Sequence, residues 1–268
     1  MTAPNTITPA QLARLIGTPD APLIIDICID EDFAEDPRLI PTSFRHPFKQ
    51  IENLAPQLGA RRTVIICHKG KKLSQGAAAV LRSHGVSAEV LEGGIVGWRA
   101  FGGALIPAQT LPQNGARWVT RHRPKIDRIA CPWLIRRFID PQARFMFVAP
   151  SEVMAVAEKF DAIPFDFDGA ELSHGEGSCS FDAMLARFDL NLPSLAKMAE
   201  VIRAADGTPE TSAPEAAGLL AISLGLSRMY RDDLAQLDAA MPIYDALYRW
   251  ARDAQGETHE WDAHGAAR

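Results

Sequence analysis

Cys67 is the residue whose sequence surroundings are best suited to chemistry. It ends the apolar run 63–67 and is followed by a short polar loop and then by a predicted helix. In an open α/β sheet, ligands bind at the carboxyl ends of the strands, where loop N–H groups and the N-terminus of the next helix favour a thiolate. The sequence therefore predicts a thiolate that attacks the outer sulfur of an anionic donor and holds it as a persulfide. The predicted substrate- and persulfide-binding loop consists of His68, Lys69, Gly70, Lys71 and Lys72. The alternative is a buried structural cysteine beside a solvated run of lysines.

A second group of reactive residue types lies further along the chain. Asp127 and Cys131 are four residues apart, so they share a face of a predicted helix. The glycine-punctuated segment 171–179 adds a histidine, carboxylates and a thiol, which together suit zinc or iron, although their spacing matches no standard metal motif. The candidate metal ligands are Asp127, Cys131, His174, Glu176 and Cys179. The alternative is a hydrogen-bonded loop in which Ser180 caps the following helix.

Basic residues are concentrated around the same predicted helix. The segment 117–137 holds seven basic residues and one acidic residue, and guanidinium groups suit tetrahedral oxyanions. The density of Arg121, Arg123, Lys125 and Arg128 indicates an oxyanion pocket. The candidate second-domain site consists of Arg123, Lys125, Asp127, Arg128 and Cys131. The alternative is a solvated face, or pairing with acids such as Asp127, Asp232 and Asp233.

The elements around Cys67 follow an α/β pattern. Thr8, Pro9 and Gln11 predict a capped helix start, and Gly17 predicts its end. The apolar runs 23–27, 63–67 and 88–91 are typical of strands covered on both faces, and 75–84 reads as a helix. This alternation predicts a small parallel sheet.

The remainder of the chain has a different pattern. The uncharged, proline-containing segment 103–116 indicates a linker, which predicts domains at 1–107 and 117–268 joined by 108–116. Strands are expected at 117–121 and 143–148, with a helix at 126–139 between them. Helices then follow, because Pro193, Pro214 and Pro242 each open an apolar-periodic stretch. The second domain is therefore predicted to be α+β and mostly helical.

Composition limits the classes of function. The 268 residues are 47% hydrophobic and 23% charged, with a net charge of −5, which argues against broad affinity for nucleic acid or anionic membranes. No apolar run approaches the roughly 18 residues that span a bilayer. The N-terminus has no secretory pattern, and the four cysteines are too few and too dispersed for a disulfide scaffold. We therefore expect a cytoplasmic protein with reduced thiols and no membrane partner.

Residues 6–106 resemble the rhodanese family. The six residues 67–72 are similar to its active-site loop, with cysteine first, glycine fourth and a cation sixth. The segment 91–98 (LEGGIVGW) resembles its glycine-rich turn, and 24–26 with 31–33 resemble its aspartate-bearing strand and the acidic-aromatic step after it. The resemblance implies sulfane-sulfur transfer by Cys67, without a cofactor, from a small-molecule donor to a thiol or cyanide. Two departures concern donor specificity: Cys28 stands where an arginine is usual, and Leu73 stands where a serine commonly follows the loop.

Residues 117–253 resemble the C-terminal domain of chromate-resistance proteins of the ChrB type. That family is associated with chromate sensing or resistance, which makes chromate a candidate ligand. Its regulators usually carry a different N-terminal domain, so the rhodanese-like unit argues against DNA binding here. The matching stretches are 118–121, 123–140, 172–174, 179–182 and 214–227.

Three functions follow as hypotheses. The first is a thiosulfate or persulfide sulfurtransferase joined to a chromate-resistance domain. The second is a sensor of chromate, of another oxyanion or of a metal, with a degenerate rhodanese module. The third is a metal-dependent redox enzyme in the second domain, with Cys131 and Cys179 as an alternative redox pair.

Overall fold

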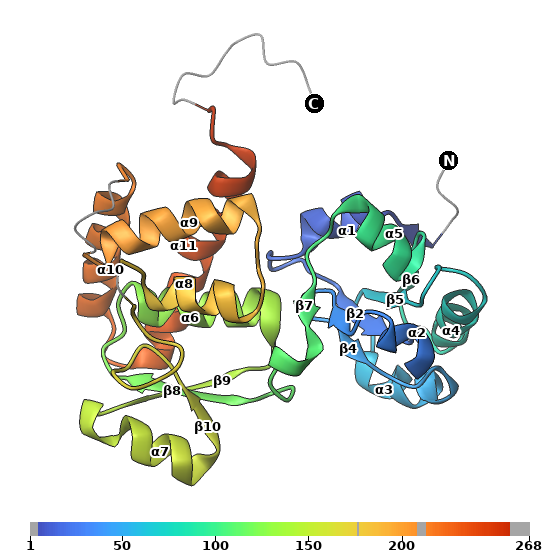
Figure 1. Cartoon of the computed structure of the whole chain (residues 1–268), viewed down its shortest axis with the longest axis horizontal. Coiled ribbons are helices and arrows are strands. Elements are labelled where there is room, and N and C mark those ends of the chain that lie inside the picture. The colour runs from blue at the N-terminus through green and yellow to red at the C-terminus, as the bar shows by residue number, and fades with distance from the viewer. Residues whose placement is uncertain (1–4, 176, 208–212, 258–268) are drawn as a thin grey trace.

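The computed structural model describes residues 5–175, 177–207 and 213–257, and its first part is built on a parallel sheet (Figure 1). The strand order is β1-β6-β5-β2-β4, and every pairing in this sheet is parallel. Side chains alternate between two core clusters: Ile24 and Val64 face one, whereas Ile25 and Ile65 face the other. The prediction that these strands are covered on both faces is therefore confirmed. The strands are β1 (Thr6–Ile7), β2 (Leu23–Asp26), β4 (Phe44–Arg45), β5 (Thr63–Ile66) and β6 (Ala88–Leu91).

The helices around this sheet follow the capping signals of the sequence. Thr8 and Gln11 form the predicted capping box at the start of α1. Helix α4 begins at Lys72, three residues before the predicted start, so its first turn lies directly behind the Cys67 loop. A short antiparallel pair, β3 (Arg38–Leu39) with β7 (Ile106–Pro107), closes this part of the chain. The helices are α1 (Pro9–Leu15), α2 (Asp30–Ala34), the 3₁₀ helix Phe48–Leu54, α3 (Ala55–Leu58), α4 (Lys72–Ser83) and α5 (Gly94–Phe101).

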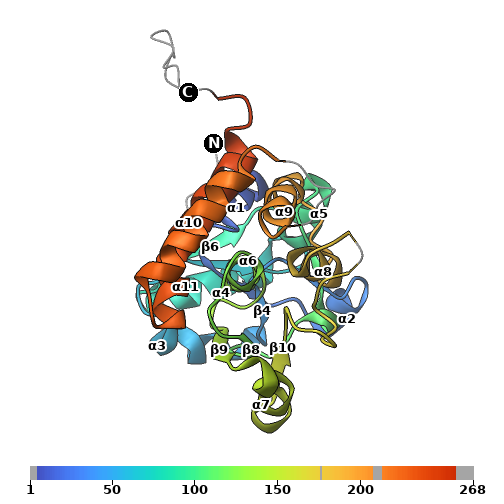
Figure 2. The same cartoon turned by 90° about the vertical axis from the view of Figure 1, so that its left-hand side faces the viewer.

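The second part is α+β and mostly helical, as the sequence predicts. Its three parallel strands have the order β10-β8-β9, with α7 packed on one face and the other helices on the opposite side (Figures 1 and 2). Helix α6 continues into a π-helical turn, Ile135–Ile139. The remaining elements are the 3₁₀ turn Ala108–Thr110, β8 (Arg117–Arg121), α6 (Asp127–Leu134), β9 (Arg144–Val148), the 3₁₀ turn Pro150–Glu152, α7 (Val153–Phe160), β10 (Ala162–Pro164), α8 (Ser180–Arg187), α9 (Pro193–Ala205), α10 (Ala216–Met229) and α11 (Asp233–Asp253).

The prolines mark helix starts in two of three cases. Pro193 is the first residue of α9, and Pro214 lies two residues before α10. Pro242, which the sequence suggested as a helix start, instead lies inside α11. An internal proline costs about 3 kcal/mol. Leu237 and Tyr244 are buried on either side of it, so tertiary packing sustains the helix through the missing hydrogen bond.

The two parts of the chain share one hydrophobic cluster. A Cβ at Gly17 would lie 2.4 Å from the Phe138 ring and 2.7 Å from the Tyr248 ring, so only glycine allows this approach. The predicted linker is ordered, because the Asp140 carboxylate accepts hydrogen bonds from the N–H groups of residues 115 and 116 at 2.8 and 3.0 Å. Within the described ranges, no helix is both long and apolar enough to cross a membrane.

Candidate functional sites

Cys67 directly follows β5, and its sulfur lies beside Ser74 in the first turn of α4. Its Sγ is 3.1 Å from Oγ of Ser74, and the Ser74 hydroxyl in turn donates to the Lys71 carbonyl at 3.2 Å. Both Cys67 and Ser74 are buried. A sulfur in this position faces the N-terminal turn of a 12-residue helix, where the helix dipole favours negative charge.

The glycine-rich start of α5 holds the Cys67 loop in place. The N–H groups of Ile95 and Val96 donate to the carbonyls of Cys67 and His68, both at 3.1 Å. Gly94 has a φ of +59°, and a Cβ there would lie 2.1 Å from the Cys67 carbonyl oxygen. The segments 67–72 and 91–98, which the sequence offered as separate motifs, therefore form one unit.

The loop side chains give this site a positive rim. Lys69, Lys71 and Lys72 are exposed, and none of them pairs with an acid in the part of the chain that the structure describes. His68 is half-buried, with Nδ1 3.8 Å from the Asp32 carboxylate. The rim can therefore attract an anionic donor toward the sulfur.

The two departures from the rhodanese pattern have structural explanations. Leu73 is not the residue beside the sulfur; Ser74, one position later, supplies that hydroxyl. Cys28 is a buried core thiol, and burial together with the Asp26 charge raises its pKa. Arg45, from β4, donates to the Cys28 carbonyl at 2.9 Å and pairs with Asp30 at 2.8 Å. An arginine therefore lies against this turn although position 28 lacks one.

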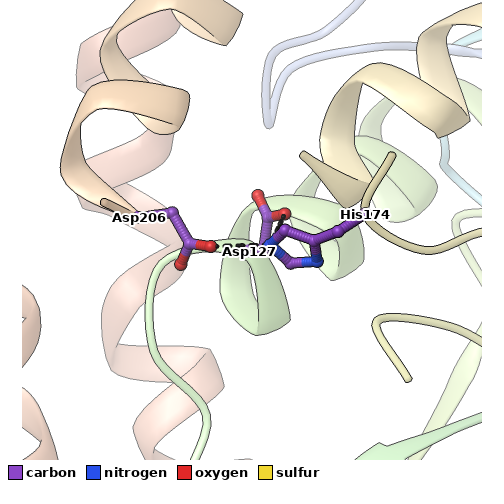
Figure 3. A group of neighbouring side chains, drawn as sticks. All are labelled: Asp127, His174 and Asp206. Atoms are coloured by element: carbon purple, nitrogen blue, oxygen red, sulfur yellow. Dashed lines mark hydrogen bonds and ion pairs between the residues drawn. The ribbon is translucent and has the colours of Figure 1, made fainter. Parts of the chain in front are cut away.

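The second site is a cluster of three side chains from distant segments. Asp127 is the first residue of α6, His174 lies in the loop before α8, and Asp206 directly follows α9 (Figure 3). Nε2 of His174 is 2.8 Å from the Asp206 carboxylate and 3.7 Å from the Asp127 carboxylate. One potential ligand atom from each residue lies within 4.8 Å of the others.

A surrounding shell fixes these groups. The Ser180 N–H donates to Asp127 at 2.6 Å, and the Ser180 hydroxyl donates to Asp166 at 2.9 Å. Nδ1 of His174 is 3.2 Å from Asp166 and 3.1 Å from the Ser180 hydroxyl. Asp166 is also paired with Arg121 at 3.1 Å and lies 3.6 Å from the Arg128 guanidinium. Asp166 and Ser180 therefore fix the orientation of the His174 ring through its Nδ1 atom.

Burial and mutual repulsion set the protonation of this cluster. Burial, followed by the charges of Asp206 and Asp166, raises the pKa of Asp127 to about 7. Burial also raises the pKa of Asp206. Burial alone would lower the pKa of His174, but the Asp206 hydrogen bond and the surrounding carboxylates outweigh it and raise that pKa.

Only part of the predicted metal set converges here. Asp127 and His174 do, whereas Cys131 and Cys179 are fully buried thiols that do not belong to the group of ligand atoms. Burial, chiefly, raises the pKa values of both thiols. Glu176 lies outside the described residues. Sequence reasoning also placed Ser180 at the cap of α8, but Cys179 is the N-cap and Ser180 is the first helical residue.

Two carboxylates of this cluster, Asp166 and Asp206, are not predicted from the sequence. Asp206 is a single acid after a helix, and Asp166 sits in the loop after β10 with a positive φ of 49°. Neither has a spacing relationship to Asp127 or His174. Only the three-dimensional packing of α6, α8 and α9 brings them together.

The basic residues predicted to form an oxyanion pocket do not converge on one site. Arg121 and Arg128 pair with Asp166, whereas Arg123 donates to the carbonyls of Ser227 and Tyr230 at the C-terminal end of α10. The Arg123 N–H also donates to Asp233, one of the acids suggested as a partner, at 3.1 Å. Lys125 lies with Arg123 beside a surface cavity against α10. The five residues of the candidate second-domain site therefore do not form one pocket, while Asp232 caps α11 through the Ala235 N–H.

Each of the two parts of the chain matches a known protein family. Residues 8–101 match the family model of the rhodanese-like domain. Residues 118–251, half of the chain, match the C-terminal domain of ChrB, and the chain belongs to this family. The protein ChrB of Cupriavidus metallidurans is 39% identical over 138 residues, which cover 50% of this chain and 40% of that protein. The chain thus matches about two fifths of the length of this curated relative.

Several solved structures are similar to a part of the chain. A thiosulfate sulfurtransferase of Pseudomonas aeruginosa is 26% identical with a TM-score of 0.32, covering 38% of this chain and 19% of that chain. A rhodanese-related protein of Thermoplasma volcanium is 21% identical with a TM-score of 0.33, covering 38% of this chain and 97% of that chain.

Proposed function

We propose that the chain is a sulfurtransferase that carries sulfur as a persulfide on Cys67. The chain joins a rhodanese-like domain to a ChrB C-terminal domain, a combination consistent with chromate resistance. The observation that carries the proposal is the position of the Cys67 sulfur, 3.1 Å from the Ser74 hydroxyl in the first turn of α4. The exposed lysines of the loop that follows Cys67 have no acidic partner among the described residues, and their charge favours an anionic donor.

The reaction proceeds in two balanced steps. The Cys67 thiolate attacks the outer sulfur of thiosulfate, a new S–S bond forms, and sulfite leaves with the electron pair of the cleaved S–S bond. An acceptor such as cyanide or a thiolate then takes the outer sulfur, and the Cys67 thiolate is restored. The chain supplies the nucleophile and the positive loop, and no cofactor is needed.

The proposed setting is a reducing cytoplasm. All four cysteines are free, and Cys67 must be a thiol to accept sulfur. We assign the sulfur chemistry to residues 1–107 and a separate role to residues 117–268, with 108–116 between them. The ChrB relationship supports a role in chromate resistance for the protein that carries this sulfur.

The test is thiocyanate formation from thiosulfate and cyanide by the full chain. Cys67→Ala should abolish turnover, and only protein with Cys67 should gain the mass of one sulfur atom after incubation with thiosulfate or a glutathione persulfide. Cys28→Ala is the matched control, because Cys28 is also a buried thiol of the rhodanese-like part. Its turnover should stay within a few-fold of wild type. Undiminished turnover in Cys67→Ala, or a wild-type protein that accepts sulfur from neither donor, would contradict the assignment of Cys67 as the sulfur carrier.

A further inference from the structure

We propose that Asp127, His174 and Asp206 form a binding site for one divalent first-row transition ion. Metal–oxygen and metal–nitrogen bonds of about 2.1 Å place neighbouring ligand atoms roughly 3 to 3.5 Å apart. The separations from His174 Nε2 to the two carboxylates are 2.8 and 3.7 Å, so small side-chain movements suffice to surround an ion. Figure 3 shows the three side chains pointing toward one another from α6, the end of α9 and the loop before α8.

A second observation, independent of the ligand distances, also indicates a bound ion: a buried oxygen of Asp127 has no hydrogen-bond partner among the described residues. Asp127 is 1% exposed, and no hydrogen-bond donor among the described residues reaches its Oδ1. Its other oxygen, Oδ2, accepts the hydrogen bond from the Ser180 N–H and is the oxygen that lies 3.7 Å from His174 Nε2. A buried carboxylate oxygen without a donor is costly unless a proton or a cation neutralises the group. A metal ion between the three side chains would supply that charge.

The groups behind the histidine have the arrangement of an outer metal shell. Asp166 and the Ser180 hydroxyl both contact Nδ1 of His174, which leaves Nε2 directed toward Asp127 and Asp206. Metal-binding histidines commonly donate their second ring N–H to a carboxylate, which fixes the tautomer and orients the ring. Arg121 and Arg128 in turn hold Asp166, so this carboxylate is committed to support rather than to the ion.

The donor set indicates the class of ion. One imidazole and two carboxylates suit Mn²⁺, Fe²⁺ or Zn²⁺, whereas soft ions such as Cu⁺ select thiolates. The thiols of Cys131 and Cys179 are buried outside the group of ligand atoms. The His174 side chain is 41% exposed and the Asp206 side chain 24%, so the outer side of the site faces solvent. Water or a small anion can therefore occupy the remaining coordination positions.

The experiment measures metal binding to the full chain. Protein stripped with a chelator and then dialysed against MnCl₂ or ZnCl₂ should retain about one equivalent of metal by elemental analysis. Asp206→Asn and His174→Gln should each weaken binding at least about tenfold. For Mn²⁺, the electron paramagnetic resonance signal of the bound ion should disappear in parallel, while far-ultraviolet circular dichroism confirms that the variants are folded.

Two controls separate this site from adventitious binding. Glu200→Gln removes an exposed acid of α9, which leads to Asp206, and His84→Gln removes a histidine of matched exposure, 40%, in the rhodanese-like part. Both variants should bind metal like wild type. The proposal is overturned if neither ion binds to wild type, or if binding survives Asp206→Asn and His174→Gln. Equal losses in the controls would overturn it as well. Thiocyanate turnover at Cys67 is a separate readout, so either proposal can fail alone.

Discussion

The Cys67 loop and the Asp127 cluster are built in opposite ways. The loop takes its groups from one continuous stretch, 67–74, and a second glycine-rich stretch clamps it through backbone hydrogen bonds. The cluster takes single side chains from α6, from the loop before α8 and from the end of α9, and polar side chains hold them. A site made of backbone depends on glycine and on helix position, whereas a site made of side chains depends on packing between distant helices.

The largest expected effect tests the backbone clamp. Gly94→Ala places a methyl group 2.1 Å from the Cys67 carbonyl oxygen and forces an alanine to a φ of +59°. The left-handed conformation costs about 1–2 kcal/mol and the overlap about 1–3 kcal/mol, so we expect about 3 kcal/mol of destabilisation in urea unfolding. Turnover at Cys67 should fall with it.

Gly76→Ala is the matched control for that substitution. Gly76 lies in α4, behind the same loop, and a Cβ there meets no atom within 4 Å. Alanine should therefore stabilise the helix by about 0.5–1 kcal/mol. If both alanine variants were equally stable, the close approach of the two loops would not constrain this site.

The contrast between the sites also explains what the sequence could predict. Strands, capped helices and the Cys67 loop follow from local patterns, since cap residues such as Thr8 act on their immediate neighbours. Asp206 and Asp166 gave no such signal, because their partners lie at least 30 residues away in the chain or face them across a loop. The helix start predicted at Pro242 is wrong for the opposite reason. Proline does disfavour a helix interior, but the packing of α11 outweighs this local preference. Ser74, one position off the expected serine, shows that register within a loop is also settled in three dimensions.

The next effect tests the side-chain cluster by pH, in protein kept with a chelator. The pKa of Asp127 is raised to about 7, chiefly by burial, with Asp166 and Asp206 adding to it and His174 opposing it. In unfolded protein this carboxyl titrates near pH 4. Between these values the folded state holds a proton that the unfolded state has released, so the free energy of unfolding falls as pH rises. His174, whose pKa is also raised, changes stability in the same direction above about pH 6.5.

We therefore expect the protein to lose roughly 2 kcal/mol of stability between about pH 5.5 and about pH 8. Urea unfolding across this range measures the loss, and Asp127→Asn should remove most of it. Asp36→Asn is the control, because its hydrogen bonds to Arg38 lower the pKa of Asp36 and move its effect below the tested range. An unchanged pH profile in Asp127→Asn would mean that this buried carboxyl does not titrate on its own.

The smallest expected effect concerns Ser74, whose hydroxyl oxygen lies 3.1 Å from the Cys67 sulfur. The Ser74 hydroxyl now donates to the Lys71 carbonyl, and it can turn toward the sulfur once Cys67 loses its proton. Ser74→Ala removes one such hydrogen bond, worth about 1 kcal/mol, so sulfur transfer and iodoacetamide alkylation of Cys67 should slow about fivefold. Ser83→Ala, at the other end of α4, removes a hydroxyl that bonds locally to the Val80 carbonyl and the His84 ring, and it should leave both rates unchanged. Equal rates in the two serine variants would assign the stabilisation of the thiolate to the loop backbone and the helix N-terminus, whereas a loss well beyond tenfold would make this site as dependent on side chains as the Asp127 cluster.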